Sequence, residues 1–350
     1  VLAERLAGKA PLAGLGAAIV ACTPDVLAEK LKAAIAHVEG AGANLPAGAY
    51  FTDAPLGREG KLAVVFSGQG SQYPDMMREL AARFPAFRSV LDAADAATAQ
   101  TPTFAGGPPL SRRIYPPERF TPADEEAAAK ALMRTSITQP ALAAVEAGAF
   151  ACLKDLGLAP DMMCGHSFGE FTALHAAGVL SADDLFGAAE ARGRAIVEAA
   201  GEGGLGSMIA ALGGEQEVRA ALGACEGVHF ANYNGPKQII LSGSDSAMGE
   251  AMRRLEKAGV TARKIPVSAA FHSPLMEPAR RPLAAYLGGR RWRDPEIAVY
   301  SNSTAAPHGG AAAIRRAMVE HLTGPVRFSQ TIEAMHAAGA RVFLEVGPKT

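Results

Sequence analysis

A serine between two glycines is the first residue of this sequence that could do chemistry. Ser167 lies in the stretch Gly-His-Ser-Phe-Gly-Glu at 165–170, between an apolar run at 160–164 and an amphipathic run at 171–179. This order predicts a strand, a sharp turn and a helix, with the serine at the turn. Such a turn exposes the hydroxyl at a helix N-terminus, where N–H groups favour negative charge on a reacting oxygen. We therefore expect a serine nucleophile, although in a chain with 38 glycines the pattern alone is not specific.

A serine nucleophile needs a base within hydrogen-bond distance. Of the eight histidines, His272 is the strongest candidate, because it lies in a predicted turn just before the next helix. His166 precedes the serine on a tight turn and should point away from it, which favours a structural role. His321 precedes a Thr-Gly-Pro turn, so it could lie near the site or cap its own helix. From the residues alone, a structural role for any one of these histidines stays open.

Arg192 lies in a predicted helix over 182–200 and is a candidate for holding an acidic substrate. A guanidinium group donates two parallel hydrogen bonds to a carboxylate, which suits this role. The alternative is a solvated helix face, and the spacing does not separate the two.

The glycines at 201–206 match GxGxxG, but they follow a helix and precede an apolar run, the reverse of a dinucleotide-binding motif. We interpret them as a crossover into the next group of elements.

Composition limits the class of protein. The chain has 49% hydrophobic and 20% charged residues, as in a soluble globular protein of about two domains. Its net charge of −1 favours neither nucleic acid nor a membrane as partner. No apolar run reaches the roughly 18 residues of a membrane span and no signal peptide begins the chain, so we expect a cytoplasmic protein. The four cysteines lack zinc-site spacing, so we expect no metal. Both ends of the chain look cut from a longer protein.

Strands and helices alternate around the candidate residues. The apolar run at 61–66 ends in Ser-Gly-Gln-Gly-Ser-Gln, which favours a strand whose following turn presents backbone amides; a plain turn is the alternative. A capping pattern at 121–124 begins a helix, and the proline-rich passage at 101–122 is interpreted as a surface excursion. The other expected elements are helices to about residue 99 and over 139–156 and 311–322, a last helix after 328, and strands over 297–301 and 341–346.

The whole pattern predicts an α/β fold with an inserted subdomain. Residues 207–267 have the order βαββαβ of a ferredoxin-like unit. We therefore expect a small ferredoxin-like subdomain at 204–267, inserted in a large α/β-hydrolase-like subdomain with a parallel sheet at 61–203 and 268–350. Residues 1–60 are a separable small α/β domain with a strand at 15–21, a helix at 26–38 and a loop at 40–60.

Several blocks together resemble the malonyl-CoA:acyl carrier protein transacylase family, which includes acyltransferase domains of polyketide and fatty acid synthases. They occur in the family's order, at residues 66–72, 165–170, 192–194, 270–276 and 345–348. The first 60 residues resemble the linker between a ketosynthase and its acyltransferase, which implies a neighbouring ketosynthase domain. The sequence at 116–120 and 138–142 most resembles iterative synthases of the polyunsaturated fatty acid or enediyne type.

The resemblance implies a role for each candidate residue. Ser167 matches the family's nucleophile, His272 its general base and Arg192 its carboxylate-binding arginine. Gln69 and Phe168 match the residues whose backbone amides form the oxyanion hole. His321 stands where the family usually has a Gln or Asn whose backbone carbonyl orients the base, which keeps a backbone role but not a side-chain role. We also count His166 and Asn232 as candidate substrate-binding residues.

The implied reaction moves a malonyl group from malonyl-CoA through an acyl-serine to the phosphopantetheine thiol of an acyl carrier protein, with no bound cofactor. Malonyl-specific polyketide acyltransferases usually carry His-Ala-Phe-His, whereas this chain has Ala-Ala-Phe-His at 269–272. Phe271 should exclude an α-methyl group, so we predict malonyl. The alternatives are a methylmalonyl-specific acyltransferase, a serine hydrolase of the α/β or patatin type, and a non-catalytic docking module.

Carrier proteins tend to be acidic, and basic residues gather near the small subdomain and the return crossing from it. Scattered solubilising charge is the alternative reading of this group. The residues are Arg253, Arg254, Lys257, Arg263, Lys264, Arg280 and Arg281.

Overall fold

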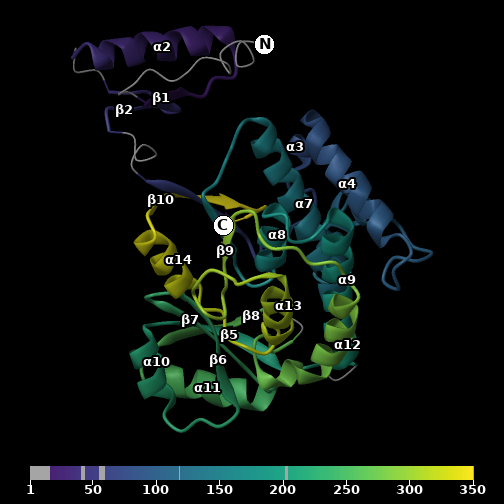
Figure 1. Cartoon of the computed structure of the whole chain (residues 1–350). Helices are drawn as coiled ribbons and strands as arrows, with labels where there is room; N and C mark the ends of the chain where they lie inside the picture. Colours follow the sequence, from purple (N-terminus) through teal and green to yellow (C-terminus); the bar gives the residue numbers. More distant parts are fainter. Residues whose placement is uncertain are drawn as a thin grey trace. The chain divides into compact units, whose positions relative to one another are not determined.

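The computed structural model describes residues 16–40, 44–54, 60–117, 119–201, 204–267 and 269–349. The chain separates into two compact units, Val1–Gly60 and Lys61–Thr350, and Figure 1 labels their elements.

The described residues of the first unit form two short antiparallel strands and a helix. Strand β1 (Gly16–Ile19) pairs with β2 (Ala49–Thr52), and α2 (Pro24–Val38) begins where Thr23 Oγ1 accepts a hydrogen bond from the N–H of Val26. The predicted helix is present. The expectation of a loop throughout 40–60 is wrong, because β2 lies within it; a four-residue strand is too short for its alternation to stand out. Residue 15, the predicted first residue of β1, lies outside the described residues.

The second unit is built on a four-stranded parallel sheet with the order β10-β3-β4-β9. Its strands are β3 (Lys61–Phe66), β4 (Met162–Gly165), β9 (Ala298–Tyr300) and β10 (Ala340–Val346). Phe66 lies opposite both Gly165 and Val346, so these strands end at one edge of the sheet. The turns after β3 and β4 therefore meet there, as in other parallel sheets.

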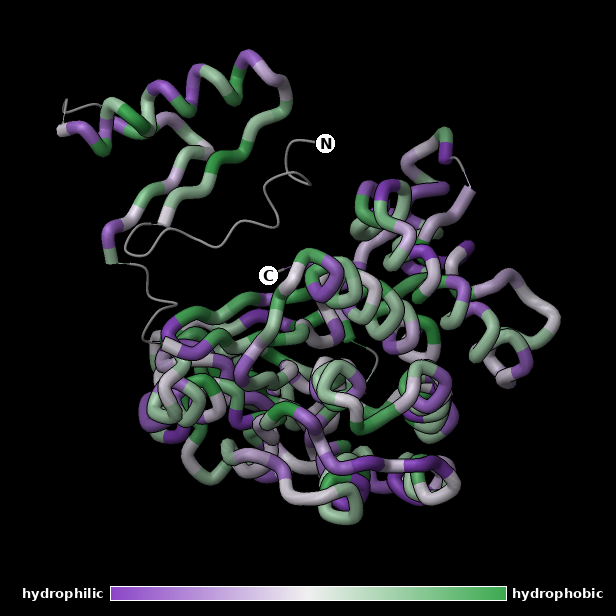
Figure 2. The backbone as a smooth tube through the Cα atoms, turned by 45° about the horizontal axis from the view of Figure 1, so that its top comes forward, coloured by the Kyte–Doolittle hydropathy of each residue, from purple (hydrophilic) through white to green (hydrophobic). Residues whose placement is uncertain are grey.

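Helices pack around this sheet and bury a common core (Figures 1 and 2). Helix α7 (Thr135–Asp155) contacts α4 (Pro85–Thr98), α8 (Gly169–Ala176) and α9 (Ala182–Ala200). Helix α7 is longer than the predicted helix over 139–156 and is long and apolar enough to cross a membrane, but most of it is buried here as a core helix. The remaining helices of this part are α3 (Arg78–Arg83), α5 (Leu110–Ile114), α6 (Pro122–Leu132), the 3₁₀ helix η2 (Pro274–Met276), α12 (Glu277–Gly288), α13 (Ala311–Glu320) and α14 (Phe328–Ala337).

The proline-rich passage is more than a surface excursion. Phe104, Leu110 and Ile114 are all buried in the core, so this segment packs instead of only crossing the surface. The capping pattern after it is confirmed: the side chain of Thr121 accepts from the N–H of Asp124, and the Asp124 carboxylate accepts from the N–H of Thr121.

The antiparallel sheet of the second unit has the order β6-β7-β5-β8. Its elements are β5 (Ser207–Leu212), α10 (Glu215–Leu222), β6 (Val228–Gly235), β7 (Gln238–Gly243), α11 (Asp245–Lys257) and β8 (Thr261–Ile265). This is the predicted βαββαβ order with its first and third strands in the centre. It has its own small core, which includes Ile209, Leu241 and Leu255. The expected ferredoxin-like arrangement is confirmed.

Candidate active site

Ser167 lies at a strained turn between β4 and α8. Its φ of +50° is in the left-handed region, which residues with a side chain rarely adopt. A Cβ at Gly165 would lie 2.0 Å from the carbonyl carbon of Gly169, and a Cβ at Gly169 would lie 2.4 Å from Ser67 O. Both glycines are therefore required by close backbone contacts, and the turn holds the serine side chain away from the sheet.

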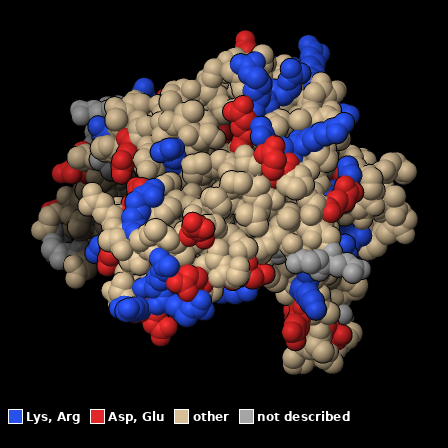
Figure 3. All heavy atoms as spheres, turned by 90° about the horizontal axis from the view of Figure 1, so that it is seen from below, with Lys and Arg blue, Asp and Glu red and all other residues tan. Residues whose placement is uncertain are grey.

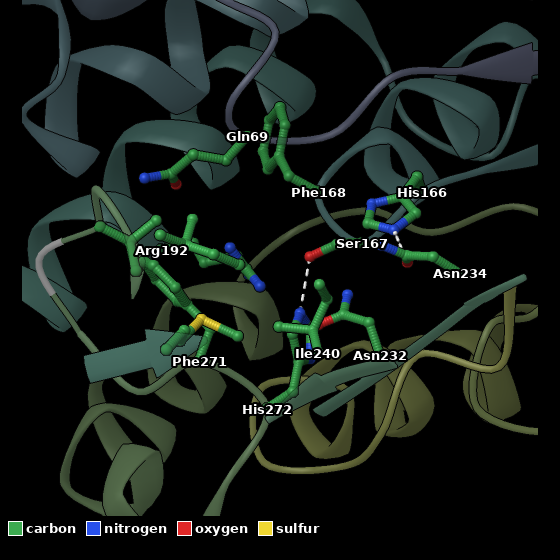
Figure 4. A pocket seen from close by; sticks show the side chains of 13 residues that line it. Gln69, His166, Ser167, Phe168, Arg192, Asn232, Asn234, Ile240, Phe271 and His272 are labelled. Atoms are coloured by element: carbon green, nitrogen blue, oxygen red, sulfur yellow. Dashed lines mark hydrogen bonds between the residues drawn. The ribbon is translucent and has the colours of Figure 1, made fainter. Parts of the chain in front are cut away.

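His272 is the hydrogen-bond partner of the serine. Ser167 Oγ lies 2.7 Å from His272 Nε2, although the two residues come from distant parts of the chain (Figure 4). On the other side of the ring, Nδ1 lies 3.1 Å from His321 O and 3.0 Å from Gly324 O. Both are carbonyl oxygens, so Nδ1 carries the proton and donates, which leaves Nε2 to accept from the serine.

The surroundings keep the His272 ring neutral. Burial is the largest of the causes that together lower its pKa to about 3; the positive charge of Arg192 and, to a smaller extent, His166 act in the same direction. A neutral imidazole is ready to accept a proton near neutral pH. Within the described part of the chain, no carboxylate is hydrogen-bonded to this ring. The Ser–His pair is therefore oriented by backbone carbonyls and not by an acidic third residue.

His321 contributes its backbone, and its side chain stays behind the base. The His321 and His272 rings make an edge contact with their centroids 5.2 Å apart. In the part of the chain that the structure describes, neither ring nitrogen of His321 has a hydrogen-bond partner, and burial lowers the pKa of this side chain well below the usual range.

Arg192 extends from α9 toward the serine and is only 1% exposed (Figure 4). Its Nε and Nη2 atoms are buried, and neither has a hydrogen-bond partner among the described residues. Burial lowers its pKa to about 10, while Glu170 acts in the opposite direction. The next residue, Gly193, lets α9 pack closely against the start of α7, since a Cβ there would lie 2.5 Å from Thr135 O. A buried cation with unused donors is an incomplete anion site.

A cavity of about 140 Å³ connects these groups. It is lined by every candidate residue named from the sequence except His321: Gln69, His166, Ser167, Phe168, Arg192, Asn232, Phe271 and His272. His166, for which a structural role was favoured, also lines the cavity, and its Nε2 lies 2.7 Å from Asn234 Oδ1. Among the described residues, no group of three or more His, Cys, Asp or Glu side chains could hold a metal.

Two backbone amides belong to residues that line this cavity. Within the described part of the chain, neither the N–H of Gln69 nor that of Phe168 donates to a protein atom. The N–H of Ser167, by contrast, donates to Asn302 Oδ1 at 2.7 Å. The Gln69 side chain is held by α7: its Nε2 donates to Thr135 Oγ1, and its Oε1 accepts from Gln139 Nε2.

A buried polar network behind the serine was not expected. Glu170 accepts from the N–H of Asn302 at 2.9 Å and lies 2.6 Å from His308 Nε2. It therefore fixes Asn302, which in turn fixes the backbone of Ser167. Glu170 belongs to the motif at 165–170, but the sequence did not predict this role for it. No local pattern marks Asn302 or Asn234, because only the fold brings them to the site.

The structure has an α/β fold with a serine and a histidine in contact at one cavity, and comparison with known proteins gives the class of enzyme, an acyltransferase. The acyl transferase domain family matches residues 63–350. The chain therefore belongs to the acyl transferase domain family, as the five sequence blocks indicated.

Relatives show the setting in which such chains occur. The phenolphthiocerol synthesis polyketide synthase Pks15/1 of Mycobacterium marinum is 37% identical over 86% of this chain, which covers 14% of that protein. The spectinabilin polyketide synthase system protein NorB of Streptomyces orinoci is 37% identical over 83% of this chain and 13% of its own length. A polyunsaturated fatty acid synthase from a Thraustochytrium species is 32% identical over 86% of this chain, which covers 11% of that relative. The chain thus spans about a seventh or less of these relatives.

Among solved structures, the acyltransferase domain of the second module of the salinomycin polyketide synthase is similar, with a TM-score of 0.79 and 35% identity. The match covers 99% of this chain and 74% of that one. FabD from Acinetobacter baumannii matches with a TM-score of 0.74 and 29% identity, over 83% and 88% of the two chains.

Proposed function

We propose that this chain transfers a malonyl group from malonyl-CoA to the phosphopantetheine thiol of an acyl carrier protein. The observation that carries this proposal is the buried Arg192: it lines the cavity that holds Ser167 and His272, and its Nε and Nη2 atoms have no hydrogen-bond partner among the described residues. A substrate carboxylate would complete its hydrogen bonds.

The first half-reaction forms the acyl-serine. His272 Nε2 takes the proton of Ser167 Oγ as the oxygen bonds to the thioester carbonyl carbon. The free amides of Gln69 and Phe168 stabilise the resulting oxyanion. When the C–S bond breaks, the coenzyme A sulfur leaves with the proton from His272. No bound metal or cofactor takes part.

The second half-reaction runs the same steps with a new thiol. His272 takes the proton of the phosphopantetheine thiol, whose sulfur attacks the acyl-serine carbonyl. The C–O bond to Ser167 breaks, and the serine oxygen recovers a proton from His272. Arg192 holds the malonyl carboxylate in both half-reactions. Asn232 and His166, with its partner Asn234, also line the cavity.

Phe271 supports malonyl as the acyl group. Its side chain is only 7% exposed and lines the cavity next to His272. A rigid aromatic ring at this place leaves little room for an α-methyl substituent, and cores tolerate added methyl groups poorly. This favours malonyl over methylmalonyl.

The two rival functions are less well supported. A serine hydrolase commonly orients its histidine with an acid, whereas here two carbonyls do so, and it has no use for a buried arginine. A non-catalytic docking module has no use for a neutral base 2.7 Å from a strained serine.

The parent context is also part of the proposal. We place the chain as a domain of a cytoplasmic multidomain synthase of the iterative type, with residues 1–60 as the linker to a ketosynthase. The large subdomain would comprise 61–203 and 268–350, and the small one 204–267.

Fewer basic side chains are free to contact the carrier than the sequence predicts, because several of the seven are in ion pairs. Glu250 pairs with both Arg253 and Arg254. Of the seven basic residues, those without an ion pair in the described part of the chain are Lys257, Arg263 and Arg281. Figure 3 shows basic and acidic side chains side by side on the face seen from below. We propose that the unpaired ones meet the acidic carrier.

Incubation with malonyl-CoA and a carrier protein bearing phosphopantetheine tests the proposal. We expect malonyl-loaded carrier, and none with Ser167→Ala. Free malonate without loaded carrier would favour a hydrolase, and no turnover of either kind would favour the docking module.

A further inference from the structure

A second buried carboxyl group lies beneath the site and takes no part in the proposed chemistry. Glu146 is in the middle of α7 and is fully buried. Its Oε1 lies 2.7 Å from Ser67 Oγ, in the turn after β3, and its Oε2 lies 2.7 Å from Thr172 Oγ1, in α8. This one side chain therefore joins the two segments that carry Gln69 and Phe168.

The contacts continue from Ser67 toward the cavity. Ser67 Oγ lies 2.9 Å from Ser71 Oγ, and the Ser71 hydroxyl lies 2.9 Å from the carbonyl oxygen of Gly68. The chain thus has four links: Thr172 to Glu146, Glu146 to Ser67, Ser67 to Ser71, and Ser71 to Gly68 O.

A count of protons gives the state of the carboxyl group. Each hydroxyl has one proton, so Thr172, Ser67 and Ser71 supply three protons for the four links. If Glu146 is ionised, one oxygen-to-oxygen contact holds no proton. If Glu146 is a neutral acid, its O–H donates to Ser67, Ser67 donates to Ser71, Ser71 donates to Gly68 O, and Thr172 donates to the other carboxyl oxygen. Every link is then a hydrogen bond.

The hydrogen bond from Ser71 to the Gly68 carbonyl can orient an amide of the candidate oxyanion hole, because the peptide bond is planar. The carbonyl of Gly68 and the N–H of Gln69 belong to one peptide unit and point in opposite directions. A hydrogen bond that fixes the direction of this carbonyl therefore also fixes the direction of the Gln69 N–H.

We propose that Glu146 is a positioning residue that, as a neutral acid, donates into the chain Ser67–Ser71–Gly68 and so aims the Gln69 amide at the developing oxyanion. Through Thr172 it also ties α8, and with it Phe168, to the same anchor. This inference rests on the proposed function, since it gives the Gln69 amide its purpose.

The electrostatic surroundings agree with this geometry. Burial raises the pKa of Glu146 to about 8, and the two hydroxyl contacts lower it less than burial raises it. The other ionisable group acting on it is Glu345 on β10, whose negative charge also raises the pKa. Packing is tight at the first link: a Cβ at Gly347 would lie 2.2 Å from Ser67 Oγ, so the Ser67 side chain has little freedom to turn away.

The test compares Glu146→Gln with Glu146→Leu by the rate of acyl-serine formation under saturating malonyl-CoA. A glutamine keeps an N–H donor for Ser67 and an acceptor oxygen for Thr172, so we expect it to stay within about 3-fold of the wild-type rate. Loss of a whole oxyanion donor costs about 100- to 1,000-fold, so a misdirected donor in Glu146→Leu should slow acylation by about 10-fold or more, with KM unchanged. If glutamine is as slow as leucine, the neutral-acid role is wrong.

Ser71→Ala gives a second test if Glu146→Leu does not fold. It removes the final link at a partly exposed position and leaves Glu146 in place. We expect a lower acylation rate with an unchanged melting temperature, and a wild-type rate would overturn the inference. The wild-type acyl-serine is the reference: if the wild type forms none, the proposed function itself fails, whereas equal rates in wild type and variants refute only the role of Glu146.

Discussion

Replacement of Arg192 by methionine should have opposite effects on activity and stability. The change removes a buried guanidinium and keeps an unbranched side chain of similar length. Loss of one partner of a buried charged pair costs about 2–5 kcal/mol, which is roughly 30- to 5,000-fold in kcat/KM for malonyl-CoA. Acetyl-CoA has no carboxylate to lose, so the malonyl-to-acetyl preference should fall by the same factor.

The free protein should become more stable through the same change. The pKa of Arg192 is lowered from 12.5 to about 10, which means that the charged form is held at a cost of about 3 kcal/mol. Apolar replacement removes this cost, and in a domain of this size each kcal/mol raises the melting temperature by about 2 °C. We therefore expect a higher melting temperature together with a lower malonyl rate.

Arg194 provides a matched control on the same helix. It is paired with Glu190 and Glu198 and is partly exposed. Arg194→Met should leave the malonyl-to-acetyl ratio unchanged and should lower stability, because it removes the positive charge that is paired with the buried Glu190. The reasoning about Arg192 is refuted if Arg192→Met keeps the wild-type ratio, or if it is no more stable than the wild type.

Four further predictions concern other parts of the site. Phe271→Ala should raise the methylmalonyl-to-malonyl ratio in competition assays; an unchanged ratio would refute the steric argument. Because the pKa of His272 is lowered to about 3, kcat/KM should be flat from about pH 5 to pH 7, and an acidic limb near pH 6.5 assigned to His272 would contradict it. The pKa of Glu146 is raised to about 8, so the stability that its neutral form contributes is lost as pH rises from about 4.3 to 8. The free energy of unfolding of Glu146→Gln, measured by denaturant titration, should therefore gain about 3 kcal/mol on that of the wild type between pH 4.3 and pH 7. Charge reversal at Lys257 and Arg263 should slow carrier loading at low salt but not acylation by malonyl-CoA, and equal loading would remove the docking proposal.

Much of the fold could be predicted because its signals are local. The run 61–66 became a strand with the predicted bounds, and helix 182–200 likewise, since periodicity and capping residues are read along the chain. The order βαββαβ was enough to predict the small antiparallel sheet. At β2 and α5 the sequence pattern is short or mixed, so tertiary packing decides the structure. The sequence alone did not predict these two elements.

The sequence named the site residues that belong to motifs, and it missed the residues that only the fold brings to the site. Ser167, His272 and Arg192 were named from motif residues and share one cavity. Asn302 and Glu146 were missed, because each meets its partner only after distant segments pack together. His166 shows a further limit: a tight turn was expected to point it away, but the cavity continues around the turn to Asn234.

The most direct test is peptide-level mass spectrometry of the protein after brief exposure to an equal mixture of malonyl-CoA and acetyl-CoA. We predict a malonyl group on the peptide containing Ser167, in large excess over acetyl, and none in Ser167→Ala. An acyl group at another residue, or equal malonyl and acetyl labelling of Ser167, would contradict the proposal that Arg192 makes this serine a carrier of malonyl.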